Sequence, residues 1–84
     1  MKTVKTMEIK LPQHGAQMTD GDIVEWFVNV GDSVTKGQEL VEIEAAKASF
    51  TIPAPNTGVV KSILAKEDEN VTVGTVIATI ETDE

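Results

Sequence analysis

The sequence of 84 residues predicts an all-β domain in which two similar sheets share one core. Short runs rich in Val, Ile and Thr alternate with turn residues about every eight to twelve positions, which is typical of β-sandwiches and barrels. No window of about twelve residues holds a convincing helical period. Residues 21–44 also repeat in residues 58–81 at a constant offset of 37. Two copies in so short a chain favour a sandwich or flattened barrel with a pseudo-twofold axis.

The expected strands follow in order, and turn residues separate them. Residues 7–11 come first and lead into a polar loop over residues 12–21. Further strands are expected at residues 22–28, 39–44, 48–52, 58–64 and 76–80, with a short link at residues 33–34 and a short strand at Val71. Because side chains alternate between the faces of a strand, Leu40 and Ile43 are expected in the core.

The repeat matches apolar, turn and acidic positions at the same time. The identical pairs at this offset are Gly21 with Gly58, Val34 with Val71, Thr35 with Thr72, Gly37 with Gly74, Ile43 with Ile80 and Glu44 with Glu81. In the first copy the chain turns after residue 44, so Lys47 is expected at or near the tip of a hairpin. The equivalent residue in the second copy is Glu84. Only one half of the domain therefore offers a lysine there.

Composition excludes several classes of function. The chain has no cysteine, which rules out disulfides, thiolate metal sites and a Cys nucleophile. Seven lysines and no arginine stand against fourteen acidic residues, and this net charge of −7 argues against binding nucleic acid or an anionic membrane. His14 has no second histidine for a metal site and no catalytic partner nearby except Asp20. We therefore expect a soluble intracellular domain with no metal site and no catalytic residue.

Several short motifs match one known family at the correct spacing. They are Leu11-Pro12 with Gly15, Gly21-Asp22-Ile23-Val24-Glu25-Trp26, Val30-Gly31-Asp32-Ser33-Val34, Lys36-Gly37-Gln38, Glu42-Ile43-Glu44, Lys47-Ala48, Pro53-Ala54-Pro55 and Gly58-Val59-Val60. Over residues 7–82 the chain resembles the biotinyl/lipoyl attachment domains. That resemblance implies a single domain over residues 1–84, folded as a flattened β-barrel of two four-stranded sheets. It also implies covalent modification of Lys47 on a hairpin turn.

The residues around Lys47 leave the identity of the modification open. Biotin acceptors usually present Glu-Ala-Met-Lys-Met and lipoyl domains Glu-Thr-Asp-Lys-Ala, whereas this chain has Glu44-Ala45-Ala46-Lys47-Ala48. The segment over residues 11–21 resembles the long surface loop of lipoyl domains in 2-oxo acid dehydrogenase complexes. The resemblance therefore favours lipoate on Lys47, with a biotin carboxyl carrier as the alternative and an unmodified structural barrel as the third possibility.

The resemblance further implies a carrier domain and not an enzyme, as part of a dihydrolipoamide acyltransferase subunit. A lipoate–protein ligase or lipoyl transferase would attach the arm. The arm would then carry acyl groups between a thiamine-dependent decarboxylase, the acyltransferase core and dihydrolipoamide dehydrogenase of a 2-oxo acid or acetoin dehydrogenase complex. Such a domain would work in a bacterial cytoplasm or a mitochondrial matrix. Residues expected to contribute to recognition are Glu44, Ala45, Ala46, Ala48 and Gly31.

Overall fold

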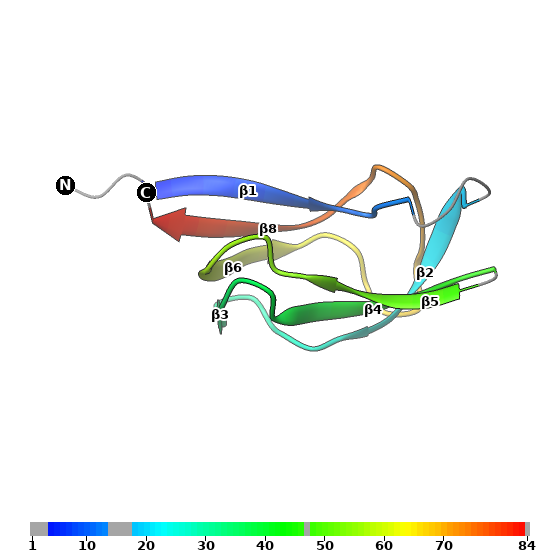
Figure 1. Cartoon of the computed structure of the whole chain (residues 1–84), viewed down its shortest axis with the longest axis horizontal. Helices are drawn as coiled ribbons and strands as arrows, with labels where there is room; N and C mark the ends of the chain where they lie inside the picture. The colour runs from blue at the N-terminus through cyan, green and yellow to red at the C-terminus, as the bar shows by residue number, and fades with distance from the viewer. Residues whose placement is uncertain (1–3, 14–17, 47, 84) are drawn as a thin grey trace.

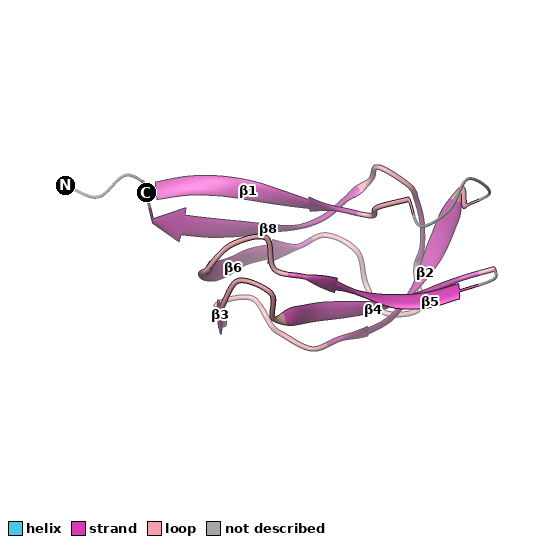
Figure 2. Cartoon of the chain, viewed as in Figure 1, coloured by secondary structure: helices cyan, strands magenta, loops and turns pink. Residues whose placement is uncertain are grey.

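A computed structural model describes residues 4–13, 18–46 and 48–83. All regular structure in these ranges is β (Figure 2). Within them, no helix is long and apolar enough to cross a membrane. The strands in chain order are β1 (Val4–Lys10), β2 (Asp20–Trp26), β3 (Ser33–Val34), β4 (Glu39–Ala45), β5 (Ala48–Pro53), β6 (Gly58–Ile63), β7 (Asn70–Thr72) and β8 (Val76–Asp83).

The strands form two four-stranded antiparallel sheets that face each other, which confirms the predicted fold class (Figure 1). Sheet A has the order β1-β8-β6-β3, and sheet B has the order β5-β4-β2-β7. Several boundaries differ from expectation: β1 runs from Val4 to Lys10, β2 ends at Trp26, β6 ends at Ile63 and β8 extends to Asp83. Asp20 and Gly21, expected in the loop, belong to β2, because they pair with Thr72 and Val71 of β7. The link at residues 33–34 is itself a strand, because it pairs with β6.

The repeat seen in the sequence relates the two sheets. At the offset of 37 residues, β2 corresponds to β6, β3 to β7 and β4 to β8. The short strands cross over, because β7 pairs with β2 of the first copy and β3 pairs with β6 of the second. Each sheet therefore contains strands from both copies, and the sheets cannot separate as two independent halves.

Hydrogen bonds outside the ladders repeat in the same way. The backbone N–H of Gly31 donates to the carbonyl of Val60 at 2.8 Å. Its equivalent, the N–H of Asp68, donates to the carbonyl of Ile23 at 2.7 Å. Both donors have a positive φ, +94° for the glycine and +68° for the aspartate. The pseudo-twofold symmetry therefore extends to the conformation of the turns.

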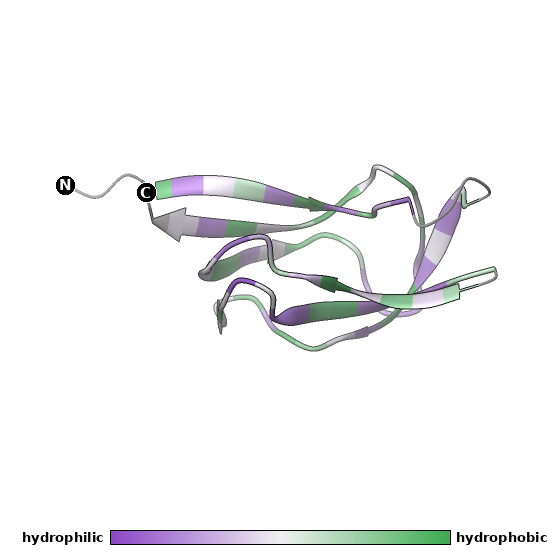
Figure 3. Ribbon diagram, in the orientation of Figure 1, coloured by the Kyte–Doolittle hydropathy of each residue, from purple (hydrophilic) through white to green (hydrophobic). Residues whose placement is uncertain are grey.

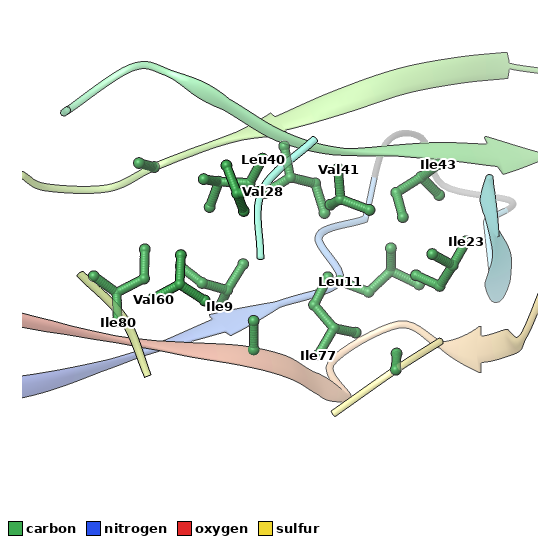
Figure 4. Packing of buried hydrophobic residues seen from close by; sticks show 14 of the residues in the cluster. Ile9, Leu11, Ile23, Val28, Leu40, Val41, Ile43, Val60, Ile77 and Ile80 are labelled. Atoms are coloured by element: carbon green, nitrogen blue, oxygen red, sulfur yellow. The ribbon is translucent and has the colours of Figure 1, made fainter. Parts of the chain in front are cut away.

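The core lies between the sheets and takes residues from both copies (Figure 4). Leu40 and Ile43 are buried, as predicted, and Ile80 is buried like its equivalent Ile43. Hydrophobic and hydrophilic residues alternate along the strands (Figure 3), as expected of strands with one buried face. Trp26 packs partly buried against this core and donates its indole N–H to the carbonyl of Ala65 at 2.8 Å.

Candidate functional site

The hairpin between β4 and β5 is the predicted place of the modified lysine. Ala45 of β4 pairs with Ala48 of β5, and Glu44 pairs with Ser49. Residues 46 and 47 connect the two strands, and Ala46 lies exposed in the turn. Lys47 itself lies outside the described residues, so its modification stays a prediction. The paired strands on both sides of it show that a tight hairpin forms where the sequence predicted one.

The hairpin lies at one end of the long axis of the molecule, and the start of β1 and the end of β8 lie at the other (Figure 1). This follows from the symmetry, because β8 is the counterpart of β4 and both strands run outward from the same core. Where β4 pairs with β5 across the hairpin, the end of β8 pairs with the start of β1, Asp83 opposite Val4. The two ends of the molecule therefore have related backbones and different connections.

Four of the predicted recognition residues come together around this hairpin. Ala46 and Ala48 are exposed, Ala45 is half-buried, and Glu44 is exposed on the outer face of sheet B. The two exposed residues that flank position 47 therefore carry only methyl side chains. This arrangement can present a side chain and a recognition surface.

Gly31 lies elsewhere in the fold. It occupies the turn before β3, and β3 lies toward the end of the molecule opposite the hairpin (Figure 1). Nothing lies within 4 Å of the position that a Cβ atom would take there. Its positive φ and its hydrogen bond to Val60 give it a backbone role in joining the two sheets.

A polar row crosses the outer face of sheet B next to the hairpin, and we call it the hairpin row. It consists of Asn70, Asp22, Glu44 and Ser49, which pair in sequence across β7, β2, β4 and β5. The side-chain amide of Asn70 donates to Asp22 Oδ1 at 2.9 Å and to Asp20 Oδ2 at 2.7 Å. Sequence reasoning missed Asn70. The signal available was its place one residue before Val71, equivalent to Ser33 before Val34.

Two hydrogen bonds shift the pKa of the Asp20 carboxyl group. Hydrogen bonds from the Asn70 amide and then from the Thr19 hydroxyl lower its pKa from the ordinary value of 3.8. The Thr19 bond measures 2.8 Å. Donors that bind the ionised form stabilise it. Asp20 is therefore held as a carboxylate beside the hairpin.

The acidic residues of the site do not form a metal centre. No group of three or more His, Cys, Asp or Glu side chains with metal-binding geometry occurs among the residues that the structure describes. His14 lies outside them. A shallow groove beside the hairpin is lined by Asp20, Gly21, Asp22, Glu44, Ala45, Ala46 and Asn70. The residues that line the groove make it a polar, acidic contact surface.

Comparisons with known proteins agree with this architecture. The model of the biotin/lipoyl family, described as a biotin-requiring enzyme, matches residues 7–80. A curated relative from Staphylococcus saprophyticus, the dihydrolipoyllysine-residue succinyltransferase component of a 2-oxoglutarate dehydrogenase complex, is 40% identical over 73 residues. The match covers 87% of this chain and 17% of that protein, so the chain spans less than a fifth of this relative's length.

Two solved structures share the fold. One is the lipoyl domain of the 2-oxoglutarate dehydrogenase complex from Azotobacter vinelandii, with a TM-score of 0.73 and 26% identity, covering 87% of this chain and 92% of that domain. The other is the urea carboxylase of Kluyveromyces lactis, with a TM-score of 0.75 and 26% identity, covering 90% of this chain and 6% of that protein. With its repeat, its two crossed sheets and a family match over residues 7–80, the chain belongs to the biotinyl/lipoyl attachment domain family.

Proposed function

We propose that this domain is a lipoyl carrier in which Lys47 holds the lipoyl group on the β4–β5 hairpin. The observation that supports this most directly is the hairpin itself, where Ala45 pairs with Ala48 on either side of residues 46 and 47. An ordinary lysine has a pKa near 10.4 and is a poor nucleophile at neutral pH. The modifying enzyme must therefore activate the reaction, and the domain must present the amine for it.

The residues that flank position 47 fit a covalently attached arm. The exposed side chains of Ala46 and Ala48 are single methyl groups, so they do not obstruct an enzyme that approaches the hairpin. Attachment forms an amide bond between Nζ and the carboxyl carbon of an activated lipoate, whose leaving group departs as the amine loses its protons. The bound lipoyl group supplies a disulfide-containing ring that carries acyl groups and electrons.

The domain contributes position and recognition to this chemistry. Strand pairing between β4 and β5 fixes where the arm begins, and a stiff scaffold raises the effective concentration of the arm at a partner's active site. Glu44 and the half-buried Ala45 lie in the last part of β4, where a partner that reaches the lysine would contact them. These residues provide a surface by which enzymes select this domain over a free lipoyl amide.

The names of the relatives point to the partners of this reaction. We infer that a thiamine-dependent decarboxylase, an acyltransferase core and dihydrolipoamide dehydrogenase share the arm, within a 2-oxo acid or acetoin dehydrogenase complex in a bacterial cytoplasm or a mitochondrial matrix. A lipoate–protein ligase or lipoyl transferase attaches it. The relatives named as acyltransferase components support this assignment, including one from an acetoin cleaving system of Pseudomonas putida that is 35% identical over 72 residues.

A biotin carboxyl carrier is the second candidate. The family description and the Ala45 that biotin acceptors share favour it. In that case the same hairpin would present biotin on Lys47, and a carboxylase and a transferase would replace the partners named above. Since both modifications use the same amine, only the chemical identity of the adduct separates them.

Intact mass spectrometry decides between these candidates. The chain is co-expressed with a lipoate ligase and a biotin ligase in the presence of both vitamins, and we expect a single lipoyl adduct. Lys47→Arg removes the adduct and leaves the Trp26 fluorescence of the folded domain unchanged. Lys36→Arg is the matched control, because it makes the same substitution at an exposed lysine in a different turn, and it keeps the adduct. A biotin adduct, or an adduct that survives Lys47→Arg, contradicts the proposal.

A further inference from the structure

The hairpin row has a structural twin on the other sheet, which we call the twin row. It consists of Ser33, Val59, Glu81 and Thr6, which pair in sequence across β3, β6, β8 and β1. At the offset of 37 residues, Ser33 corresponds to Asn70, Val59 to Asp22 and Glu81 to Glu44. A groove on this face is lined by Ser33, Val34, Thr35, Asn56, Thr57, Gly58, Val59 and Glu81. The fold has therefore built one surface twice, with different side chains.

The twin row is arranged in a way that favours stability. Val59 lies between Ser33 and Glu81, so no two acidic side chains are neighbours across these strands. The Glu81 carboxylate also forms an ion pair with Lys61 at 3.6 Å. This end of the molecule carries one compensated acid in the row.

The hairpin row carries an electrostatic conflict instead. Asp22 and Glu44 are direct partners across β2 and β4, and like charges placed opposite each other destabilise a sheet. The position equivalent to Lys61 is Val24, which offers no compensating charge. Neither acid forms an ion pair with another residue in the described ranges. The amide of Asn70 is what holds the carboxylate of Asp22.

Asn70 reaches three consecutive residues of β2. Its Nδ2 donates to Asp20 and Asp22 at 2.7 and 2.9 Å, and it lies 3.4 Å from the carbonyl oxygen of Gly21. Hydrogen bonds to ionised acceptors are stronger than those between neutral groups. Asp22 is drawn toward β7, on the side away from Glu44. This one side chain thereby adds to the β2–β7 strand pairing at the start of β2, the strand next to the hairpin strand β4.

We propose that Asn70 is a positioning residue for the modification of Lys47, because it holds Asp20 and Asp22 against β7 and leaves Glu44 beside the hairpin for the modifying enzyme to bind. This inference rests on the proposed lipoylation of Lys47. Asn70 acts through the two aspartates and Glu44, and it does not contact the reacting amine. In the part of the chain that the structure describes, Ser33, the equivalent residue, forms no comparable side-chain hydrogen bond to β6. The twin row therefore lacks the arrangement that Asn70 gives the hairpin row.

The test compares Asn70→Ala with Ser33→Ala, which truncate equivalent exposed residues without changing the net charge. Steady-state lipoylation is measured with purified lipoate–protein ligase, lipoate and ATP. We expect Asn70→Ala to raise the KM for the domain about three- to tenfold with little change in kcat, which corresponds to the loss of about one charge-assisted hydrogen bond. Ser33→Ala should leave both constants unchanged. Equal values for wild type and Asn70→Ala overturn the inference.

A second pair of variants separates positioning from simple destabilisation. Asn70→Ser introduces the residue that the fold already holds at the twin position, and it should also raise KM while the domain stays folded in urea titrations. If Asn70 acts through Asp22, then Asn70→Ala has a much smaller effect in an Asp22→Asn background, as a double-mutant cycle would show. Additive effects in that cycle overturn the inference. If the ligase labels the wild-type domain normally, the proposed function stands whatever the result for Asn70. If the ligase never labels the wild-type domain, both the proposed function and the inference about Asn70 fail.

Discussion

The end of the molecule that carries the β4–β5 hairpin and the end where β1 begins and β8 finishes have equivalent backbones and different surfaces. On the first, Asp22 and Glu44 face each other across two strands. On the second, Val59 takes the place of the aspartate and Lys61 neutralises Glu81. The interior is shared and nearly symmetric, since Ile43 and Ile80 are both fully buried. Duplication has kept the core alike while the surfaces diverged.

This difference identifies the pair formed by Asp22 and Glu44 as a feature that lowers the stability of the domain. Because the core and the turns are symmetric, this domain of 84 residues uses the same packing arrangement twice. One acidic pair, Asp22 with Glu44, lies at the hairpin end, where we propose that other enzymes bind, and Glu25 with Glu42 continues it along the same two strands. Local rules of stability are commonly violated at functional sites. The twin row is an internal reference, because the equivalent backbone there carries a single acid that is paired with Lys61.

The largest effect is expected from truncating the symmetric core. Ile43→Ala and Ile80→Ala each remove a fully buried side chain, and each should cost about 2–5 kcal/mol of unfolding free energy. Because the two sites are equivalent, the two losses should agree within about 1 kcal/mol. Urea denaturation followed by Trp26 fluorescence measures both. A clear difference would show that the core is less symmetric in energy than in structure.

Glycines at equivalent positions should respond unequally to a methyl group. A Cβ on Gly58 would contact the backbone carbonyl oxygen of Glu81, which cannot move without breaking the sheet. A Cβ on Gly21 would lie 2.8 Å from Cγ2 of Ile43, which is part of a side chain that can shift. We expect Gly58→Ala to cost about 3 kcal/mol and Gly21→Ala about 1 kcal/mol by the same urea measurement. Equal losses of unfolding free energy for the two variants would contradict the expectation that the added Cβ atom meets a more rigid neighbour at Gly58.

The turns before β3 and β7 offer a smaller and sharper comparison. Gly31 has φ of +94° and open space around its Cβ position, so Gly31→Ala should cost only the backbone strain, about 1 kcal/mol. Gly31→Asp should cost less, because the equivalent turn already accommodates Asp68 at +68°. Thermal unfolding of the two variants shows which substitution lowers the stability more. The reverse order would mean that the turns are not energetically equivalent.

The smallest effect concerns the titration of Asp20. Its folded-state pKa lies below 3.8 because Asn70 and Thr19 donate to the carboxylate. The stability that this group contributes is therefore present above its unfolded pKa and is lost as the pH falls through the lower folded value. NMR detection of the carboxyl group should show that Asn70→Ala raises the pKa of Asp20. An unchanged pKa would mean that the Asn70 hydrogen bond does not form in solution.

Much of this fold was predictable because its signals are local. Alternating runs such as residues 39–44, bounded by turn residues, predicted strands close to those observed. The match of Ile43 to Ile80 at one offset predicted equivalent core positions. The hairpin around position 47 followed from the same pattern. The boundary at Asp20 was wrong, because that residue joins β2 only through its pairing with Thr72.

The sequence alone determined the β class, the duplication and the place of the hairpin, because alternation, turn residues and repeat spacing are properties of neighbouring or regularly spaced residues. Tertiary structure decided which strands share a sheet. It placed β3, which follows the Gly31 turn, toward the end opposite the hairpin (Figure 1), and it brought Asn70 onto Asp20 and Asp22 from 50 and 48 residues away. Such contacts depend on the crossing of β3 and β7 between the two copies. No local pattern encodes that crossing, since it is stabilised only when both sheets close over one core.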